Sequence, residues 1–436
     1  MVNTVRIGVL GCGNVGAGLV RLVGERADDI EARTGLRLEI ARVAVRNVSK
    51  RREVELPDSV LTNDAAAVVN DPEVDLVVEV IGGIEPAREL ILDALKGGKP
   101  VVTANKELLA NVGAELFAAA DAGQRDLLFE AAVAGGIPII RPLRESLAGE
   151  KISRVMGIVN GTTNYILTQM TEDGATYQEA LAEAQRLGYA EGDPTADVEG
   201  FDAGAKAAII ASIAFGVRVV AGDVYHEGIS GISASDIAFA TRLGYAIKLL
   251  AVIEQADAED GGAPEVAVRV HPAMVPHSHP LASVNDAFNA VFIEGDAVGD
   301  LMFYGRGAGG MPTASAVLGD VIDAAVNLRQ GTCATVGTLG KARIRAIDEI
   351  SSEYYLNVEV NDSPGVLSEV AGVFGRHGVS IRSMEQEGLG SEARLIFITH
   401  EAREKDLQAT LRELRDLPVV LRVGSVLRVV GHDHPH

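Results

Sequence analysis

The chain begins with an apolar strand, three glycines at fixed spacing and an amphipathic helix. Residues 5–10 predict the strand, and Gly-Cys-Gly-Asn-Val-Gly follows directly. The first glycine of such a motif permits a tight turn, the second lets the backbone approach a pyrophosphate, and the third lets the helix pack on the strand. Because the motif lies between a strand and a helix, it predicts a dinucleotide site. Its residues are Gly11, Gly13, Asn14, Val15 and Gly16.

A second predicted strand, residues 38–45, ends at Arg46. An acidic residue at this place would accept the ribose hydroxyls of NAD, whereas an arginine suits the 2′-phosphate of NADP. Lys50, Arg51 and Arg52 follow, so a solvated basic loop is the alternative interpretation. We expect NADP as the cofactor, with NAD accepted.

Strands and helices continue to alternate through the first third of the chain. Residues 74–81, 100–106 and 126–133 predict further strands, and Pro86 begins a helix. This alternation predicts a parallel, Rossmann-type sheet with ligands beyond the carboxyl ends of its strands. Lys106 would then face the cofactor crevice; otherwise it is a surface lysine. We assign this dinucleotide-binding domain to residues 1–133, completed by 308–345.

Composition limits the other classes of function. With 436 residues and 47% hydrophobic residues, the chain is long and apolar enough for two or three folded domains. No apolar run is long enough to cross a bilayer, and no leader precedes the first strand. Cys12 and Cys333 form no disulfide framework, which favours the cytoplasm. A net charge of −22 opposes binding to nucleic acid or to membrane surfaces.

Residues 134–307 predict an α+β domain for substrate binding and dimerisation. Residues 160–165, which include Thr162, follow a strand over 152–159 and are dense in hydroxyls and amides. They can contact a polar ligand or simply cap a helix. Thr176 begins a capping box, and Gly188 ends that helix. Residues 229–235 precede a predicted helix that contains Leu243, Ile247 and Leu250.

A hairpin over 289–294 and 300–304 leads to a second glycine-rich segment, 305–313. It precedes a predicted helix over 314–328. Its glycines can line the approach to the cofactor, or the segment can be a flexible turn. They are Gly305, Gly307 and Gly309.

Five carboxylates and one lysine are concentrated in residues 189–206. On the helix predicted from residue 200 onward, Asp202 and Lys206 are four residues apart and share a face. An ion pair at a helix start is the simple interpretation. The acids upstream instead favour recognition of an ammonium group, with Lys206 placed to move a proton. These acids are Glu191, Asp193, Asp197 and Glu199.

The last eighty residues predict a separate small domain. After a linker at 351–353, alternating residues predict a half-buried strand with Tyr354, Leu356 and Val358 on its inner face. A helix starting at 362–365, two strands, a second helix and a last strand from residue 419 follow. The order βαββαβ and the sequence Asp-Ser-Pro-Gly-Val-Leu resemble an ACT domain, here over residues 352–431.

These motifs together resemble those of monofunctional homoserine dehydrogenases with a C-terminal ACT domain. Val-Val-Thr-Ala-Asn-Lys, Asn-Gly-Thr-Thr-Asn-Tyr-Ile-Leu, Glu-Gly-Asp-Pro-Thr-Ala-Asp-Val-Glu-Gly-Phe-Asp-Ala-Gly-Ala-Lys and Gly-Ala-Gly-Gly-Met-Pro-Thr-Ala-Ser occur in the family's order. The resemblance covers residues 5–340. It implies reversible NAD(P)H-dependent reduction of L-aspartate 4-semialdehyde to L-homoserine, in threonine, methionine and isoleucine biosynthesis.

The resemblance also implies roles for single residues. Lys206 would donate a proton to the aldehyde oxygen beside Asp202, Glu191 would hold the substrate ammonium, and Lys106 would lie between nicotinamide and substrate. Asp197 and Thr162 would belong to the substrate site, and Gly188 to the cofactor site. A structural sodium ion would be held by Glu130, Val133, Gly135 and Ile137.

Three further expectations concern assembly and regulation. The resemblance implies a homodimer or homotetramer. It also implies feedback by threonine through the ACT domain, for which oligomerisation is the alternative role. We expect removal of residues 352–436 to leave catalysis intact and to abolish sensitivity to threonine. Two other functions fit the motifs: an oxidoreductase for a different amino-acid aldehyde, and a non-enzymatic regulator in which Lys206 and Glu191 are incidental.

Overall fold

The structure is a computed structural model that describes residues 3–256, 264–334, 336–388 and 390–431. The chain forms two compact units, which are described separately. Unit 1 comprises Met1–Val155, Gly204–Val224 and Asn289–Ala342. Unit 2 comprises Met156–Ala203, Tyr225–Phe288 and Arg343–His436. No helix among the described residues has the length and hydropathy to cross a membrane.

A parallel sheet forms the centre of unit 1, with the strand order β3-β2-β1-β4-β5-β6. The central strand β1 is flanked on both sides, with Val9 opposite Val43 on β2 and Val78 on β4. These valines are fully buried, as expected for a sheet covered on two faces. The strands are β1 (Asn3–Leu10), β2 (Leu36–Ala44), β3 (Leu61–Thr62), β4 (Leu76–Glu79), β5 (Val101–Thr103) and β6 (Leu127–Leu128).

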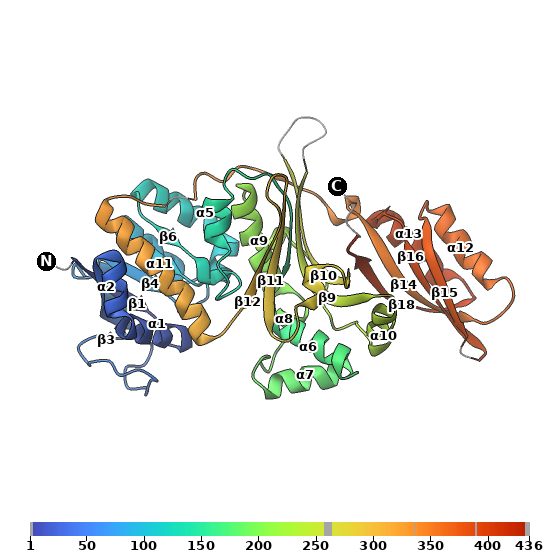
Figure 1. The fold of residues 1–436 in the computed structure, drawn as a ribbon, viewed down its shortest axis with the longest axis horizontal. Helices are drawn as coiled ribbons and strands as arrows, with labels where there is room; N and C mark the ends of the chain where they lie inside the picture. The colour runs from blue at the N-terminus through green and yellow to red at the C-terminus, as the bar shows by residue number, and fades with distance from the viewer. Residues whose placement is uncertain (1–2, 257–263, 335, 389, 432–436) are drawn as a thin grey trace. The chain divides into compact units, whose positions relative to one another are not determined.

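Helices cover this sheet, and one of them comes from far along the chain. α11 (Gly310–Gln330) packs beside α1 (Asn14–Glu25), and its Val317 and Val321 belong to the core of the parallel sheet (Figure 1). The remaining elements that begin in unit 1 are α2 (Ala27–Thr34), α3 (Ala65–Asn70), α4 (Ala87–Lys96), α5 (Lys106–Gly123), η1 (Glu130–Ala132), η2 (Pro142–Ser146), β7 (Ile152–Ile158), η3 (Ala221–Asp223) and β12 (Gly299–Arg306). α9 (Phe201–Phe215) and β11 (Phe288–Gly295) enter unit 1 from unit 2.

Unit 2 contains a long antiparallel pair, β9 (Tyr245–Ala256) and β10 (Glu265–Pro276). The C-terminal strand β18 (Val420–Val429) pairs in parallel with β10, with Ala273 opposite Arg428. The sheet therefore continues from β10 into the C-terminal domain. The smaller elements are α6 (Gly161–Glu172), α7 (Tyr177–Arg186), α8 (Thr195–Val198), β8 (Tyr225–His226), α10 (Ala234–Arg242), η4 (Pro280–Ser283), β13 (Arg343–Ile344) and η5 (Ile347–Glu349).

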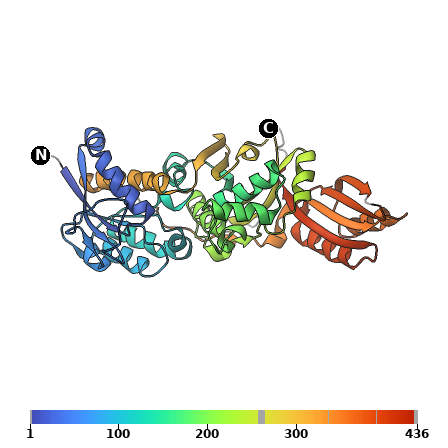
Figure 2. The ribbon, with the colours of Figure 1, turned by 90° about the horizontal axis from the view of Figure 1, so that it is seen from below.

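The C-terminal domain has the predicted βαββαβ order. Two helices lie on one face of its sheet and share a buried core with it (Figure 2). Phe374 of the first helix stacks against Phe397 with ring centroids 4.8 Å apart. The elements are β14 (Ser351–Asn361), α12 (Val366–Arg376), β15 (Ile381–Gly388), β16 (Glu392–Thr399), β17 (Ala402–Arg403) and α13 (Glu404–Asp416), followed by β18.

Several predicted elements differ from the structure. The helix expected to contain Leu243, Ile247 and Leu250 is wrong, because α10 ends at Arg242 and the last two residues lie in β9. Residues 245–253 are apolar except for Lys248 and are buried on both faces of this strand, so they show no period that separates strand from helix. The linker at 351–353 is the start of β14. Both faces of β14 are buried at residues 354–358, so it is not half-buried.

Two strands of unit 1 are shorter than predicted. The strand expected over 100–106 ends at Thr103, because Asn105 caps α5 by accepting a hydrogen bond from the Leu108 N–H. Lys106 is therefore the first residue of a helix. The strand expected over 126–133 is only Leu127–Leu128, and a 3₁₀ turn follows at Glu130.

Candidate functional site

The glycine turn after β1 has the geometry that the motif predicts. Gly11 has a φ of +102°, in the left-handed region that side chains rarely adopt. At Gly16, a Cβ atom would lie 2.3 Å from the Gly11 carbonyl oxygen, so only glycine permits this approach. A Cβ atom on Gly13 would have nothing within 4 Å. The first and third glycines are thus required by the fold, whereas the second borders open space.

The open space at Gly13 lies at the N-terminus of α1. Gly13 is the N-cap residue, no side chain caps the helix, and the first turn carries no acidic residue. The N–H groups of Asn14, Val15 and Gly16 have no partner within the helix by construction, and the helix dipole adds positive potential. This donor set fits a pyrophosphate.

In the basic segment after β2, two arginine side chains have different surroundings. Arg46 is exposed at the end of the strand. Arg52 instead turns back on its own loop and donates to the carbonyls of Asn47 and Lys50, at 2.5 and 2.8 Å. Burial raises the pKa of Cys12 in the glycine turn, and the positive charge of Arg52 opposes that rise. Positive charge is therefore close to the cofactor turn.

A buried acid that the motifs did not reveal lies at the end of β4. Glu79 is fully buried, accepts from the Ile81 and Gly82 N–H groups, and receives the Thr103 hydroxyl at 2.6 Å. The Asn105 amide donates to the Gly83 carbonyl at 2.6 Å. The network fixes the turn after β4 to the start of α5, where Lys106 is half-buried. The sequence signal was an acid at the end of an apolar strand.

The second glycine segment is packed rather than flexible. A Cβ atom on Gly307 would lie 1.9 Å from the Asn289 amide nitrogen, so this glycine is excluded from substitution by packing. A Cβ atom on Gly135 would lie 2.4 Å from the Gly307 carbonyl oxygen. Gly305 is partly buried, and Gly309 is exposed as the N-cap residue of α11. This segment lies against residues 135–136 of unit 1.

One of the predicted sodium ligands, the Glu130 carboxylate, already accepts hydrogen bonds. Glu130 is buried, and its two carboxylate oxygens accept from the backbone N–H groups of residues 139, 140 and 141. Among the described residues, no backbone N–H donates to the carbonyls of Val133, Gly135 or Ile137. Within the same limits, no cluster of three His, Cys, Asp or Glu side chains forms a metal site. The free carbonyls fit a hard cation that prefers oxygen ligands.

In unit 2, one amide holds two of the predicted substrate carboxylates. The Asn160 side chain donates to Asp197 Oδ1 at 2.7 Å and to Asp202 Oδ2 at 2.9 Å. Its oxygen caps α6 by accepting from the Thr163 N–H. Asn160 and Asp202 are buried, and Asp197 is partly buried. Asn160 therefore caps a helix, as the alternative interpretation expects, and also holds two acids of the cluster.

The neighbouring turn after α7 is tied to α6. The Thr162 hydroxyl donates to the Tyr189 carbonyl at 2.6 Å, and the Tyr165 and Tyr189 rings lie 4.8 Å apart. Gly188, with a φ of +80°, ends the preceding helix as predicted. Glu191 follows on this turn and is exposed. Thr162 thus fixes the turn that carries Gly188 and Glu191.

Asp202 and Lys206 both lie on α9, four residues apart, and both are less than 10% exposed. Charged groups with so little exposure are costly unless other groups compensate them. The first two turns of α9 thus combine an acid held by Asn160 with a buried amine. A solvated surface pair is excluded by this burial.

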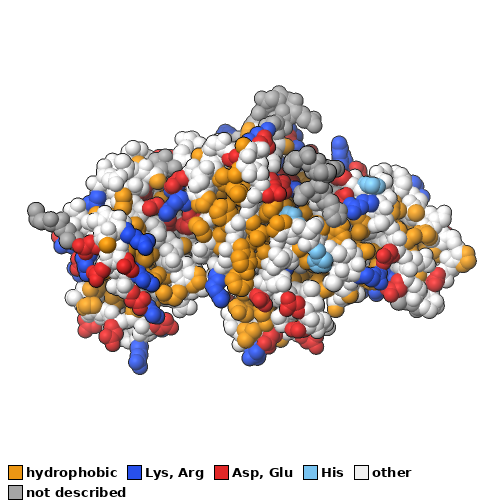
Figure 3. Space-filling model, in the orientation of Figure 1, with side chains coloured by type: hydrophobic (Ala, Val, Ile, Leu, Met, Phe, Trp, Pro, Cys, Tyr) orange, Lys and Arg blue, Asp and Glu red, His pale blue; other side chains and the backbone are white. Residues whose placement is uncertain are grey.

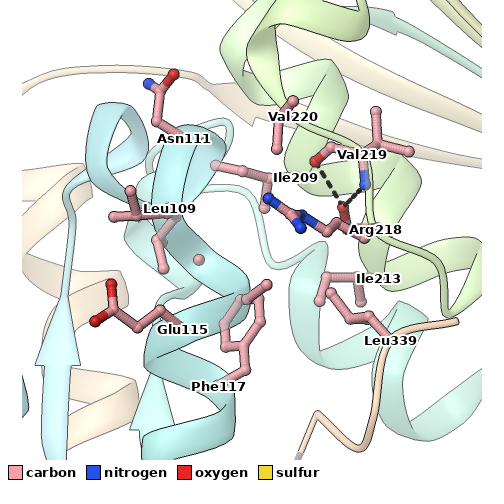
Figure 4. A pocket seen from close by; sticks show the side chains of 14 residues that line it. Leu109, Asn111, Glu115, Phe117, Ile209, Ile213, Arg218, Val219, Val220 and Leu339 are labelled. Carbon is pink, nitrogen blue, oxygen red and sulfur yellow. Dashed lines mark hydrogen bonds between the residues drawn. The ribbon is translucent and has the colours of Figure 1, made fainter. Parts of the chain in front are cut away.

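Unit 1 also encloses a cavity of about 260 Å³ between α5 and α9 (Figure 4). Apolar side chains, including Phe117, Ile209 and Ile213, form its walls, and the Arg218 guanidinium extends among them. None of the predicted site residues lines it. Lys106 and Lys206 lie on the two helices that form the cavity, outside its lining.

Comparison with known families covers almost the whole chain. The profile of homoserine dehydrogenase matches residues 138–322, that of the homoserine dehydrogenase NAD-binding domain residues 11–130, and that of the ACT domain residues 354–419. The homoserine dehydrogenase of Corynebacterium glutamicum is 53% identical over 428 residues, which cover 98% of this chain and 96% of that protein. The Bacillus subtilis enzyme is 43% identical over 433 residues, with 98% and 99% covered.

Solved structures agree with these matches. A homoserine dehydrogenase from Thiobacillus denitrificans superposes with a TM-score of 0.90 at 40% identity, covering 98% of both chains. A hyperthermophilic archaeal homoserine dehydrogenase in complex with NADPH gives a TM-score of 0.62 at 28% identity, covering 74% of this chain and 98% of that one. The predicted family and fold class are confirmed. The chain belongs to the homoserine dehydrogenase family, NAD(P)-dependent oxidoreductases that interconvert L-homoserine and L-aspartate 4-semialdehyde.

Proposed function

We propose that Lys206 is the general acid of this reaction and that Asp202 assists it. The observation that carries the proposal is the burial of both groups on the first turns of α9, with Asp202 held by Asn160. In the direction of aldehyde reduction, negative charge develops on the carbonyl oxygen. A protonated Lys206 stabilises that charge and donates a proton to the oxygen, an effect typically of about 10² to 10⁴ in rate. Oxidation of homoserine needs the neutral amine and is favoured at higher pH.

The acid cluster of unit 2 supplies the substrate site. The substrate carries an ammonium group, for which the carboxylates of Glu191, Asp197 and Asp202 are suitable partners. Asn160 fixes two of these carboxylates, while Thr162 fixes the turn that carries Glu191. Lys106, held by the Asn105 cap at the start of α5, would lie between substrate and nicotinamide and pair with the substrate carboxylate.

We propose NADP as the preferred cofactor, with NAD accepted. A bound NADPH supplies the hydride that reduces the aldehyde carbon. The N–H groups of Asn14, Val15 and Gly16 would hold its pyrophosphate, and the exposed Arg46 would pair with its 2′-phosphate. The NADPH complex of the archaeal relative supports this preference. Around the nicotinamide half we place Lys106, Gly188, Gly305, Gly307 and Gly309.

A sodium ion is proposed at the Glu130 carboxylate and the carbonyls of Val133, Gly135 and Ile137. Its support is the set of carbonyl oxygens described above. Replacing sodium chloride by choline chloride should lower the melting temperature, since a ligand of the native state stabilises it. An unchanged melting temperature would contradict the proposed sodium site.

The domain division also remains a proposal: residues 1–133 with 308–345 for the dinucleotide, 134–307 for substrate and dimerisation, and 352–431 for regulation. We further propose a homodimer or homotetramer in the cytoplasm. β12 is the terminal strand of its sheet, and Val298, Met302 and Tyr304 at and beside it are exposed. Figure 3 shows hydrophobic side chains gathered over β11 and β12. Light scattering should give twice or four times the chain mass of 45.7 kDa.

One assay tests the proposed function as a whole: oxidation of NADPH with L-aspartate 4-semialdehyde, with and without threonine. We expect turnover that exceeds the rate with NADH, and inhibition by threonine through the ACT domain. Cofactor binding without turnover would support the non-enzymatic regulator. Turnover only with another amino-acid aldehyde would reassign the substrate, and turnover unaffected by threonine would leave the ACT domain with an oligomerising role.

A further inference from the structure

A buried arginine of the C-terminal domain contacts the substrate domain of unit 2. Arg428 on β18 is 5% exposed and donates to two carboxylates. Its Nη1 contacts Glu227 Oε1 at 2.9 Å, and its Nη2 contacts Glu404 Oε2 at 2.8 Å. The Tyr225 hydroxyl donates to the same Glu227 oxygen at 2.7 Å. Because Arg428 is buried, loss of either carboxylate partner would leave its charge uncompensated. The arginine therefore holds Glu227 in place.

Glu227 begins a loop that lies directly against residues 198–200. The Ile229 N–H donates to the Val198 carbonyl at 2.8 Å, and the Ser230 hydroxyl donates to Glu199 Oε1 at 2.8 Å. A Cβ atom on Gly228 would lie 2.4 Å from Glu199 Oε2, which shows how closely the two segments pack. A displacement of this loop would therefore displace residues 198–200.

Residues 198–200 connect the two carboxylates that Asn160 holds. Asp197 precedes them within α8, and Asp202 follows them at the start of α9. The rings of Phe201 and His226 add a second contact between the segments, with centroids 5.1 Å apart. A continuous set of contacts thus leads from Arg428 through Glu227 to the substrate acids.

We propose that Arg428 and Glu227 are positioning residues for the substrate carboxylates. The inference rests on the proposed role of Asp197 and Asp202 in binding the substrate ammonium. The C-terminal domain then completes the substrate site even without an effector. Our expectation that residues 352–436 can be removed without loss of catalysis is revised accordingly, because their removal would also take away Arg428 and the partner strand of β10.

The test compares Glu227→Gln and Arg428→Met in the full chain. Glu227→Gln retains the shape of the side chain and the contact between Arg428 and Glu404, so it is the milder change. We expect each variant to raise the KM for L-aspartate 4-semialdehyde about five- to thirty-fold, the factor that corresponds to 1–2 kcal/mol. The KM for NADPH should stay unchanged. The substrate KM of the double variant should resemble that of the single variants, because both substitutions disrupt the same contact between Arg428 and Glu227.

Arg376→Met is the matched control. Arg376 lies in the same domain, is exposed and pairs with Glu413 on the domain's own surface. It should leave every kinetic constant unchanged. A folded Glu227→Gln with the wild-type substrate KM would overturn the inference. If the variants instead lower the apparent kcat, and kcat/KM for both substrates, by the same factor as the folded fraction, the contact is merely structural.

Asp202→Asn separates this inference from the proposed function. If Asp202→Asn raises the substrate KM and Glu227→Gln does not, the inference alone fails. If Asp202→Asn leaves both kcat and substrate KM unchanged, the proposed substrate site itself is wrong.

Discussion

The side-chain amide of Asn160 donates to Asp202 Oδ2 at 2.9 Å, four residues before Lys206 on the same helix. Its second N–H donates to Asp197, and its oxygen caps α6. All three polar functions of one buried side chain are therefore used. Asn160 links the start of a helix to the acid cluster in which we place the substrate.

Replacing Asn160 by serine or alanine should separate these two roles. Both variants lose the amide and should raise the KM for L-aspartate 4-semialdehyde about tenfold or more, because each lost bond to a charged group is worth about 1.5–3 kcal/mol. Only Asn160→Ala also loses the helix cap, which costs about 1 kcal/mol in the free energy of unfolding. Steady-state kinetics and urea unfolding check the two effects; equal stability of the variants would contradict the capping role.

The glycine turn allows a matched pair of substitutions. Gly16→Ala places a methyl group against the Gly11 carbonyl and should destabilise the protein by about 1–3 kcal/mol. Gly13→Ala places its methyl group in open space, so its melting temperature should match the wild type. Its NADPH dissociation constant should nevertheless rise, because the methyl group occupies the path of the pyrophosphate. NADPH binding as tight as in the wild type would place the cofactor elsewhere.

Arg46→Glu should change the choice of cofactor. Loss of the cation, and repulsion by the new carboxylate, should lower kcat/KM for NADPH about 10- to 100-fold, as expected for the loss of a charge-assisted hydrogen bond worth about 1.5–3 kcal/mol. The value for NADH should rise or stay constant. Arg33→Glu, which makes the same charge change at an exposed position of α2, is the control. An equal effect of both variants would indicate only a general electrostatic field.

Lys248 predicts a pH dependence of stability. Burial lowers its pKa to about 8, and its Nζ donates to the Val284 carbonyl at 2.6 Å. The unfolded lysine has the higher pKa of 10.5, so between pH 8 and pH 10.5 the unfolded chain binds more protons and stability rises with pH. The full effect is roughly 3 kcal/mol. Urea unfolding at pH 8 and pH 10 should show this rise in the wild type and a smaller one in Lys248→Met; identical slopes would contradict it.

Local chemistry made features of both units predictable. The glycine spacing, the capping box at Thr176 and the helix end at Gly188 depend on residues near one another in sequence, and the structure reproduces each of them. The acid cluster was likewise visible in one short segment. Its connection to Asn160 was not, because this contact joins residues 37 and 42 positions apart.

Long-range contacts account for what the sequence did not reveal. Arg428 reads as an ordinary residue of a final strand, and only its burial between Glu227 and Glu404 gives it a role. Glu79 likewise lies in an apolar run of the sequence, and only its hydrogen bonds with the Ile81 N–H and the Thr103 hydroxyl reveal its role. Residues 245–253 were mistaken for a helix because burial on both faces removes the alternation that marks a strand.

The reduction of L-aspartate 4-semialdehyde by Lys206→Met tests the central claim most directly. Kinetics at saturating NADPH should show kcat lowered about 10²- to 10⁴-fold, the range of general acid catalysis, with the NADPH dissociation constant unchanged. Lys341→Met, at an exposed position of unit 1, should behave as the wild type. A Lys206→Met enzyme with the kcat of the wild type would remove Lys206 from the mechanism.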